Sequence, residues 1–401
     1  MNRTLLVIVA LLVPLLVVSR AGANEAPYTF SVACDLQNAD ITDDSLAKGW
    51  RPGDPNGIDD QWRQAVRDGL GDLSANAGGA KDLVVCGDIP EGHWGRDDLR
   101  TGIFGPTDTE AHRVTAVKNA AGRVYSFYKG QMAASGLTVF PVIGDHEIGD
   151  NPWGNGSAYQ QFKRRNMYVF KQRWAHYFTA DGKRFADHPR GTNVDDTAYA
   201  TMLSPDVMLV GVDMFTRTRD NVDNVLGGGE LRWLDTTLAK ARARGVKWIV
   251  VEGHDPVLGP VRYRHSSRQM YRGGQSSAFW ATMRRHHVDV YLCGEVHDTT
   301  AIVPDDGGPV QISSGGLFYQ GQWGYLNATV TGDRLQVTDR YFPGAVTSTA
   351  DGYLWQTERA AIVPADVDYS APSEVRGTMT IDRDGTVPER SGSLDVYQPV
   401  S

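Results

Sequence analysis

The chain has 401 residues, of which 41% are hydrophobic, and a formal net charge of −8. This length and apolar content are enough for one large domain or for a domain with an appendage. Charged residues of both signs are well mixed and the balance is acidic, so we expect no nucleic-acid-binding surface.

The first 23 residues have the pattern of a secretory signal peptide. Arg3 gives a short basic start, residues 5–18 are mostly apolar, and Ala21-Gly22-Ala23 forms a small-x-small cleavage site. We therefore predict cleavage after Ala23 and a secreted or extracytoplasmic protein, in a periplasm or at a cell surface, with no stable membrane span after cleavage. The alternative is an uncleaved anchor, but the apolar run is shorter than the about 20 residues that a membrane span needs.

Five apolar runs have the composition of buried strands in a parallel sheet, because they lack a polar alternation. In chain order they are residues 28–34, 82–86, 137–143, 247–252 and 288–293, followed by Asp35, Asp88, Asp145 with His146, His254, and Glu295 with His297. In four of the five a glycine stands between the run and the polar residue. A glycine there lets the backbone turn sharply and lets a ligand come close.

The segments between these runs predict helices and further strands. We expect helices over residues 59–71, 110–136, 157–178, 230–244 and 277–286, and strands over 196–203 and 207–213. From Ala301 onward, alternating runs predict an antiparallel sheet, and the end of the chain predicts short strands and turns. The predicted organisation is a signal peptide over 1–23, a main domain over 24–345, and a β-rich C-terminal extension over 346–401 that is packed on the domain or appended to it.

Three cysteines are few for an exported protein, and an odd number cannot pair completely within one chain. Cys34, Cys86 and Cys293 each lie at the end of a predicted strand, where they are typical of small buried core residues. A disulfide between Cys34 and Cys86 is an alternative. Thiolate metal ligands are disfavoured, because the spacing is not that of a zinc site.

Carboxylates and imidazoles therefore follow strand after strand, at the strand ends where open α/β sheets bind ligands. Asp, Glu and His together have the composition of a hard or borderline metal site. A residue such as Asp88 could instead cap the next turn, and His146 could be structural. The repetition along the chain favours the metal site, and the neighbouring carboxylates of Asp145 and Glu147 favour His146 as a general acid.

In order, these motifs resemble those of the calcineurin-like metallophosphoesterase superfamily, which includes the purple acid phosphatases. The family has five motifs in the order D-x-H, G-D, G-N-H-D/E, a lone G-H and G-H-x-H. In the same order, the corresponding residues of this chain are Asp35-Leu36-Gln37, Gly87-Asp88, Gly144-Asp145-His146-Glu147, Gly253-His254 and Gly294-Glu295-Val296-His297. The resemblance extends over residues 31–302. It implies an α/β (α+β) fold with two packed mixed β-sheets flanked by helices in a four-layer sandwich.

The resemblance also implies a site with two divalent metal ions. One ion would be held by Asp35, Gln37, Asp88 and His297, and the other by Asp88, Asp145, His254 and Glu295, with Asp88 bridging the two. His146 would protonate the leaving group while a water between the metals attacks phosphorus in line. Gln37 could ligate, or could only hydrogen-bond a metal-bound water or a ligand carboxylate.

Three ligand positions depart from the family pattern, at Gln37, Asp145 and Glu295. Each replaces one metal-capable side chain with another, which indicates an altered site rather than a lost one. Because the set is rich in oxygen ligands, it favours Mn²⁺, Mg²⁺ or Fe, with Ca²⁺ as an alternative, over Zn²⁺. More anionic ligands also raise the pKa of a bound water and weaken attraction for a phosphate dianion, so we expect slower phosphatase chemistry or a less charged substrate such as a diester.

Three further residues are candidates for binding substrate: His93 on the loop after Asp88, Arg164, and Arg262. A solvated helix face and a basic loop would explain both arginines equally well. The predicted function is an exported metal-dependent phosphoesterase that acts on a phosphorylated small molecule or a phosphodiester. The alternatives are a catalytically silent binding protein of the same fold that holds one structural metal ion, and a different metal-dependent hydrolase, since fold does not determine function.

Overall fold

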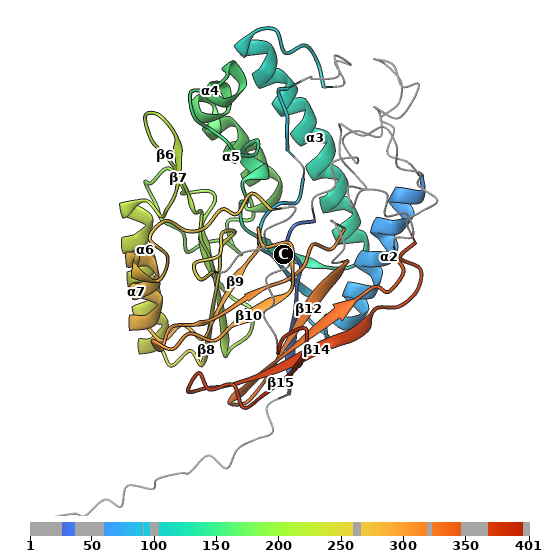
Figure 1. Ribbon diagram of the computed structural model, residues 1–401, viewed down its shortest axis with the longest axis vertical. Coiled ribbons are helices and arrows are strands. Elements are labelled where there is room, and N and C mark those ends of the chain that lie inside the picture. The colour runs from blue at the N-terminus through green and yellow to red at the C-terminus, as the bar shows by residue number, and fades with distance from the viewer. Residues whose placement is uncertain are drawn as a thin grey trace, which may run out of the picture.

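The computed structural model describes residues 26–36, 60–90, 92–96, 104–259, 266–318, 323–345 and 368–395. Two large β-sheets lie in the middle of the protein with helices on both outer sides (Figure 1). The seven-stranded sheet has the spatial order β15 (Glu389–Gly392), β14 (Glu374–Asp382), β13 (Arg334–Tyr341), β12 (Gly324–Thr331), β1 (Tyr28–Val32), β2 (Asp82–Val85) and β3 (Thr138–Pro141). The six-stranded sheet has the order β10 (Thr300–Ile302), β11 (Val310–Ser313), β9 (Val290–Cys293), β8 (Trp248–Glu252), β5 (Val207–Gly211) and β4 (Tyr199–Met202).

Each sheet combines a parallel part with antiparallel neighbours. In the seven-stranded sheet, β1, β2 and β3 run parallel, whereas β12 pairs with β1 antiparallel. In the six-stranded sheet, β5, β8, β9 and β11 run parallel, and β4 and β10 are antiparallel edge strands. A separate antiparallel pair is formed by β6 (Phe215–Arg217) and β7 (Val222–Asn224).

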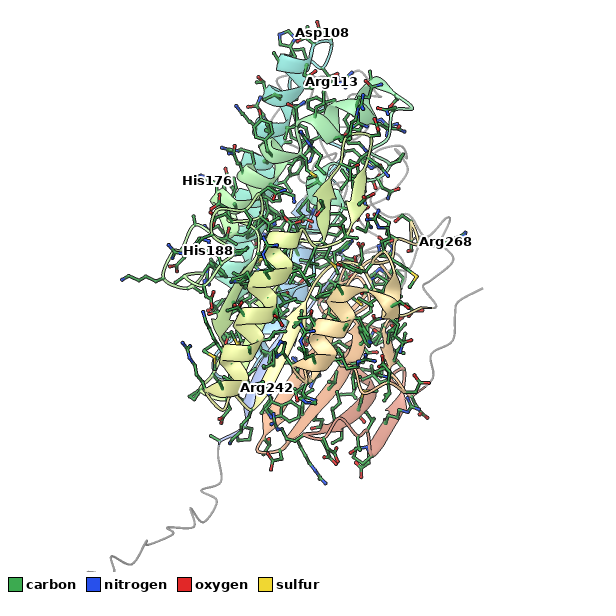
Figure 2. All side chains as sticks on the ribbon, turned by 90° about the vertical axis from the view of Figure 1, so that its left-hand side faces the viewer. Asp108, Arg113, His176, His188, Arg242 and Arg268 are labelled. Atoms are coloured by element: carbon green, nitrogen blue, oxygen red, sulfur yellow. The ribbon has the colours of Figure 1, made fainter. Side chains whose placement is uncertain are left out.

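Helices cover the outer face of each sheet and complete four layers. The helices over the seven-stranded sheet are α2 (Asp60–Asn76), α3 (Glu110–Ala134) and α5 (Met167–Phe178), with the short α4 (Ala158–Arg165) beside α5. Those over the six-stranded sheet are α6 (Gly228–Ala243) and α7 (Ala278–Arg285), which lie next to each other in Figure 2. Two single-turn 3₁₀ helices, η2 (His146–Ile148) and η3 (Gly274–Ser276), lie in loops. Among the helices that the structure describes, none combines the length and the apolar character of a membrane span.

The apolar runs of the sequence are explained by burial of both faces of the central strands. In β2, Leu83 packs toward the helices of its own sheet, whereas Val84 packs between the two sheets. In β8, Val250 packs between the sheets, whereas Ile249 packs toward α6 and α7. A strand with two buried faces needs no polar alternation, which is why these strands appear in the sequence as continuous apolar runs.

The predicted α/β class with two packed mixed sheets flanked by helices is confirmed. The single helix expected over 157–178 is two helices, because the amide of Asn166 donates to the Phe162 carbonyl and to Glu110 where the axis breaks. The purely antiparallel sheet expected after Ala301 is wrong in part, since β11 pairs with β9 in parallel.

The chain end and the cysteines complete this description. Strands β14 and β15 extend the same sheet that contains β1, so residues far apart in sequence share one layer. Cys34, Cys86 and Cys293 are buried and free in the structure, as expected of small core residues. The predicted signal peptide lies outside the described residues and stays a prediction.

Candidate metal centre

Six of the predicted ligands meet where the carboxyl ends of the two parallel strand sets face each other. Asp35, Asp88 and Asp145 follow β1, β2 and β3, whereas His254 follows β8, and Glu295 and His297 follow β9. All six side chains are buried. We call Asp35, Asp88, Asp145, His254, Glu295 and His297 the metal centre.

Within the metal centre, the ligand atoms form two compact groups that share Asp88. One group contains Asp88, Asp145, His254 and Glu295, the other contains Asp35, Asp88 and His297, and the ligand atoms of each group lie within 4.8 Å of one another. His254 Nε2 lies 3.3 Å from Asp88 Oδ2 and 3.1 Å from Asp145 Oδ1. His297 Nε2 lies 3.7 Å from Asp35 Oδ1. Apart from Gln37, which lies outside the described residues, these are the two groups, with Asp88 in both, that the family resemblance implies.

The backbone of the metal centre is held in conformations that are unfavourable for these residue types. Asp35, Asp88, Glu295 and His297 have φ angles of 49°, 57°, 61° and 52°. A left-handed conformation costs a non-glycine residue about 1 kcal/mol or more, and such strain concentrates at functional sites. Gly144 lies so close to Asp88 that a Cβ there would be 2.1 Å from Asp88 Oδ1. The β2 and β3 loops therefore approach each other only because this position is a glycine.

The proton on His254 is assigned by its hydrogen bonds. Nδ1 lies 2.8 Å from the Cys86 carbonyl oxygen, which can only accept, so Nδ1 carries a proton. Nε2 then faces the carboxylates of Asp88 and Asp145. A neutral imidazole oriented in this way presents the Nε2 lone pair to the centre, as metal-ligating histidines do when a carbonyl holds the other nitrogen.

The carboxylates of the centre are close enough to disfavour one another's charge. Burial raises the pKa of Asp35 well above its usual range, and burial together with the charge of Asp145 raises the pKa of Glu295 to about 8. Burial acts on Asp145 in the same direction, but the nearby His146 and His254 outweigh it and hold its pKa low. Asp35 Oδ2 is buried without a hydrogen-bond partner. Four buried carboxylates with an unsatisfied oxygen are a donor set that fits bound divalent cations.

The structure also identifies supporting residues that the sequence did not single out. Both oxygens of Glu147 are used: it accepts from the backbone N–H groups of Asp88 at 2.9 Å, Ile89 at 2.8 Å and Gly144 at 2.7 Å. Glu147 therefore joins the β2 loop to the β3 loop. The position of Glu147 in the motif, directly after His146, could have indicated this role from the sequence. The sequence analysis considered Glu147 only as a neighbour of His146.

Two carboxylates of the centre are oriented by residues from distant segments. Asp145 Oδ2 accepts from the side-chain amides of Asn151 at 3.1 Å and Gln269 at 2.6 Å. Glu295 Oε1 accepts from the hydroxyls of Ser266 at 2.8 Å and Ser267 at 2.7 Å. Such contacts orient ligand carboxylates and tune their basicity. Nothing in the local sequence of Gln269 or the two serines indicates this role.

His146 lies at the edge of the centre rather than within it. Its Nε2 is 3.9 Å from Asp88 Oδ2 and 3.9 Å from Asp150 Oδ1, and its side chain is 14% exposed. His93, a predicted substrate contact, lies beside it: the two rings are 5.9 Å apart, and His93 Nε2 is 2.8 Å from Asp150 Oδ2. A partly exposed imidazole beside buried carboxylates is in a position to exchange a proton with a bound molecule.

The prediction that Arg164 binds substrate requires correction. Its guanidinium is buried and donates to the backbone carbonyls of Trp153 at 3.1 Å and Asp220 at 2.7 Å and to Asn155 Oδ1 at 2.8 Å. These contacts join loops to α4, so Arg164 is occupied structurally. Gln37 and Arg262 lie outside the described residues, and their predicted roles stay predictions.

Comparisons with known proteins identify the family of this chain. A family model for calcineurin-like phosphoesterases matches residues 49–298, which is more than half of the chain. The solved structure of PhoD is similar with a TM-score of 0.54 and 13% identity, over 94% of this chain and 74% of that one. A dimetal phosphatase from Danio rerio is similar with a TM-score of 0.49 and 15% identity, over 78% of this chain and 95% of that one. Curated protein sequences provide no significant match. At such identities the likeness to PhoD shows a shared fold and nothing finer.

Proposed function

Because the chain belongs to the calcineurin-like phosphoesterase family and is a metal-dependent phosphoric ester hydrolase, we propose that it is exported and hydrolyses phosphate mono- or diesters at the metal centre. The observation that supports this proposal is the pair of ligand groups that share Asp88. Export rests on residues 1–23, which have the basic start, apolar run and small-residue site of a signal peptide.

We assign the residues of the centre to two cation positions. Asp35, Asp88 and His297 would hold one divalent ion, and Asp88, Asp145, His254 and Glu295 would hold the other. When bound, such ions supply Lewis acidity toward a phosphoryl oxygen and make a water nucleophilic at neutral pH. The protein residues contribute fixed orientation: Glu147 joins the loops of Asp88 and Gly144, and the amide of Gln269 holds Asp145.

His146 is the residue we propose as proton donor to the leaving oxygen. It is the titratable side chain that is both adjacent to Asp88 and partly exposed at the border of the centre. Its backbone N–H donates to Asp88 Oδ1 at 3.1 Å, which fixes the backbone of His146 beside the shared carboxylate, and its imidazole Nε2 lies 3.9 Å from Asp88 Oδ2. A proton delivered from that position to the departing alcohol would make departure easier, by about 10²- to 10⁴-fold for a poor leaving group.

The ligand set also supports a choice of metal. Four carboxylates and two imidazoles are rich in oxygen, which favours Mn²⁺, Mg²⁺ or Fe, then Ca²⁺, over Zn²⁺. The carboxylates of Asp145 and Glu295 are responsible for this preference, because they occupy positions where the family motifs have nitrogen or amide side chains.

The decisive measurement is elemental analysis of the exported protein, purified without chelator, combined with hydrolysis of an aryl phosphate monoester and diester. Close to two equivalents of a first-row metal or Mg²⁺, with release of the aryl alcohol, is the expected result. One Ca²⁺, or no metal after incubation with Mn²⁺, together with no hydrolysis, would overturn the proposal and favour a binding protein with a structural ion.

A further inference from the structure

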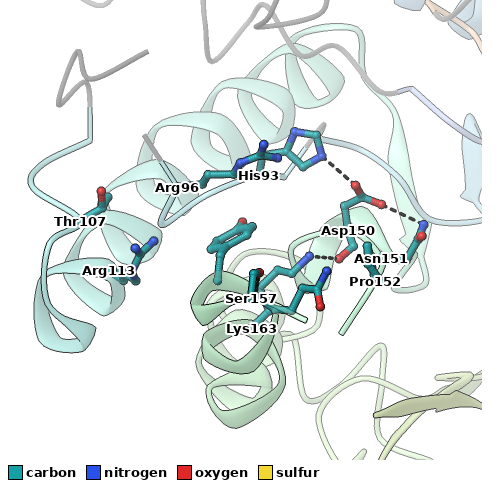
Figure 3. Close-up of a pocket in the computed structure, with 11 residues that line it drawn as sticks. His93, Arg96, Thr107, Arg113, Asp150, Asn151, Pro152, Ser157 and Lys163 are labelled. Carbon is teal, nitrogen blue, oxygen red and sulfur yellow. Dashed lines mark hydrogen bonds and ion pairs between the residues drawn. The ribbon is translucent and has the colours of Figure 1, made fainter. Parts of the chain in front are cut away.

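A cavity of about 420 Å³ is lined by two neighbours of His146, which are His93 and Asp150. The rings of His93 and His146 have centroids 5.9 Å apart, and His146 Nε2 lies 3.9 Å from Asp150 Oδ1. The rest of its wall comes from the loop after β2, the start of α3 and the start of α4 (Figure 3). We call this space the cationic cavity, for the residues described next.

Three cationic side chains gather in this cavity around the ring of Tyr159. The guanidinium carbons of Arg96 and Arg113 lie 5.9 Å from the ring centroid, and Lys163 Nζ lies 4.8 Å from it. All three line the cavity, where the one carboxylate of the described lining residues is Asp150. The ring itself is held in place, because the Tyr159 hydroxyl donates to the Trp94 carbonyl at 3.0 Å.

The contacts of two of these cations use carbonyl oxygens. Lys163 is only 2% exposed, and its amine donates to the backbone carbonyl of Asp150. Arg113 donates to the backbone carbonyl of Gly95 at 2.6 Å. A carbonyl satisfies a donor but does not neutralise its charge. Burial lowers the pKa of Lys163 to about 8, so the amine is still mostly protonated at pH 7.

The carboxylate of Asp150 does not compensate these charges fully. One oxygen lies 2.8 Å from His93 Nε2, and the other accepts from the Asn151 amide at 3.0 Å. Even without counting Arg96, the two cations Arg113 and Lys163 outnumber the one carboxylate of the described lining, in a protein whose overall net charge is −8. A concave site lined by one sign of charge concentrates ligands of the opposite sign.

We infer that the cationic cavity is a subsite for a second anionic group, carried by the leaving alcohol of the substrate. This inference rests on the proposed function, which places the leaving oxygen beside His146, next to the lining residues His93 and Asp150. The substrate class is then a phosphate ester whose alcohol bears a carboxylate or a further phosphate. Guanidinium groups suit both, because their forked N–H donors bind two oxygens of a planar or tetrahedral anion.

The inference is tested with a pair of esters that differ in one charge. The phosphate ester of 4-hydroxybutyrate and that of 4-hydroxybutyramide have similar leaving groups, but only the first presents an anion. We expect kcat/KM to be about tenfold higher for the carboxylate ester, as one charge-assisted contact provides. The ratio of kcat/KM for the bisphosphate and the monophosphate of butane-1,4-diol measures the same effect for a phosphate group. Comparing this ratio with that of the carboxylate pair tells which anion the subsite prefers.

Variants locate the preference in the cavity. Arg113→Gln should reduce the ratio of kcat/KM for the two esters by about fivefold or more, whereas Arg113→Lys should retain part of it. Arg165→Gln is the matched control, because Arg165 is a neighbour of Lys163 that is 49% exposed and pairs with Glu110 outside the cavity. In the unmodified protein, raising the NaCl concentration from 50 to 300 mM should lower the same ratio, since salt screens the cations.

The outcomes separate the inference from the function on which it rests. Hydrolysis of both esters at equal efficiency, with no effect of Arg113→Gln or salt on the ratio, would overturn the subsite and leave the phosphoesterase function standing. Absence of hydrolysis for these esters and for aryl phosphates, in protein with a full metal content, would overturn both.

Discussion

The metal centre and the cationic cavity both lie near His146, which neighbours Asp88 of the centre and His93 and Asp150 of the cavity, and they have opposite charges. The centre collects four buried carboxylates from the ends of parallel strands, and cations are required to balance them. The cavity collects cationic side chains from the loop after β2, the start of α3 and the last turn of α4, and its described lining contains one carboxylate. The comparison teaches that the net charge of −8 describes neither region: one is suited to bind metal, and the other to attract an anion.

The largest effect is expected from removing the residue that belongs to both ligand groups. Asp88→Ala should abolish binding of both cations and lower phosphate release by about a thousandfold or more, because the shared carboxylate is lost. Metal content by elemental analysis and turnover are measured together. Asp206→Asn, which changes a partly exposed carboxylate that pairs with Lys247, serves as the control. Retention of one full equivalent of metal would show that Asp88 does not belong to both positions.

The border between the two regions is tested at His146. His146→Gln should leave metal content unchanged but lower kcat for an alkyl phosphate by about 10²- to 10⁴-fold, because the leaving alkoxide then departs without a proton. A nitrophenyl phosphate, whose leaving group needs little protonation, should lose far less. Equal losses for both esters would contradict the role of His146 as the proton donor.

The acidic character of the centre is tested by exchanging its two unusual carboxylates. The double variant Asp145→Asn with Glu295→His should shift the preference from Mn²⁺ toward Zn²⁺, because it adds a nitrogen donor and removes two negative charges. We expect a change of about tenfold in the Zn²⁺ to Mn²⁺ affinity ratio, measured by competition. An unchanged ratio would mean that these side chains are not ligands.

The smallest expected effect is the pH dependence of stability in metal-free protein. The pKa of Glu295 is raised to about 8, and His254 has a raised pKa because the pull of Asp88 and Asp145 outweighs burial. Both groups bind protons more tightly in the folded state, so folding stability falls as pH rises from 5 through 8. Asp145, whose pKa is lowered, has its effect below this window.

The corresponding measurement is the melting temperature after chelation, followed over pH 5 to 9. A fall of about 5 °C is expected, and saturating Mn²⁺ should remove most of it, because the cation replaces the protons. If the chelated and the Mn²⁺-saturated protein had parallel pH profiles, the buried carboxylates would not be the groups that titrate.

The sequence predicted strands β1, β2, β3, β8 and β9, and together with the family resemblance it predicted the fold class and the six candidate ligands. These features were predictable because a strand with both faces buried appears as an apolar run, and because each candidate ligand follows its strand by two to four residues. The order of the motifs then indicated the family, which the match over residues 49–298 shows.

Which side chains outside the motifs face the metal centre or the cationic cavity depends on the tertiary packing. Lys163 and Arg164 are adjacent in sequence, yet one lines the cavity and the other joins loops, because successive residues of a helix point about 100° apart and the packing of α4 sets its rotation. Gln269 reaches Asp145 across 124 positions of sequence. The cavity itself is assembled from three separate segments around Tyr159, and no local sequence pattern indicates that these segments lie together.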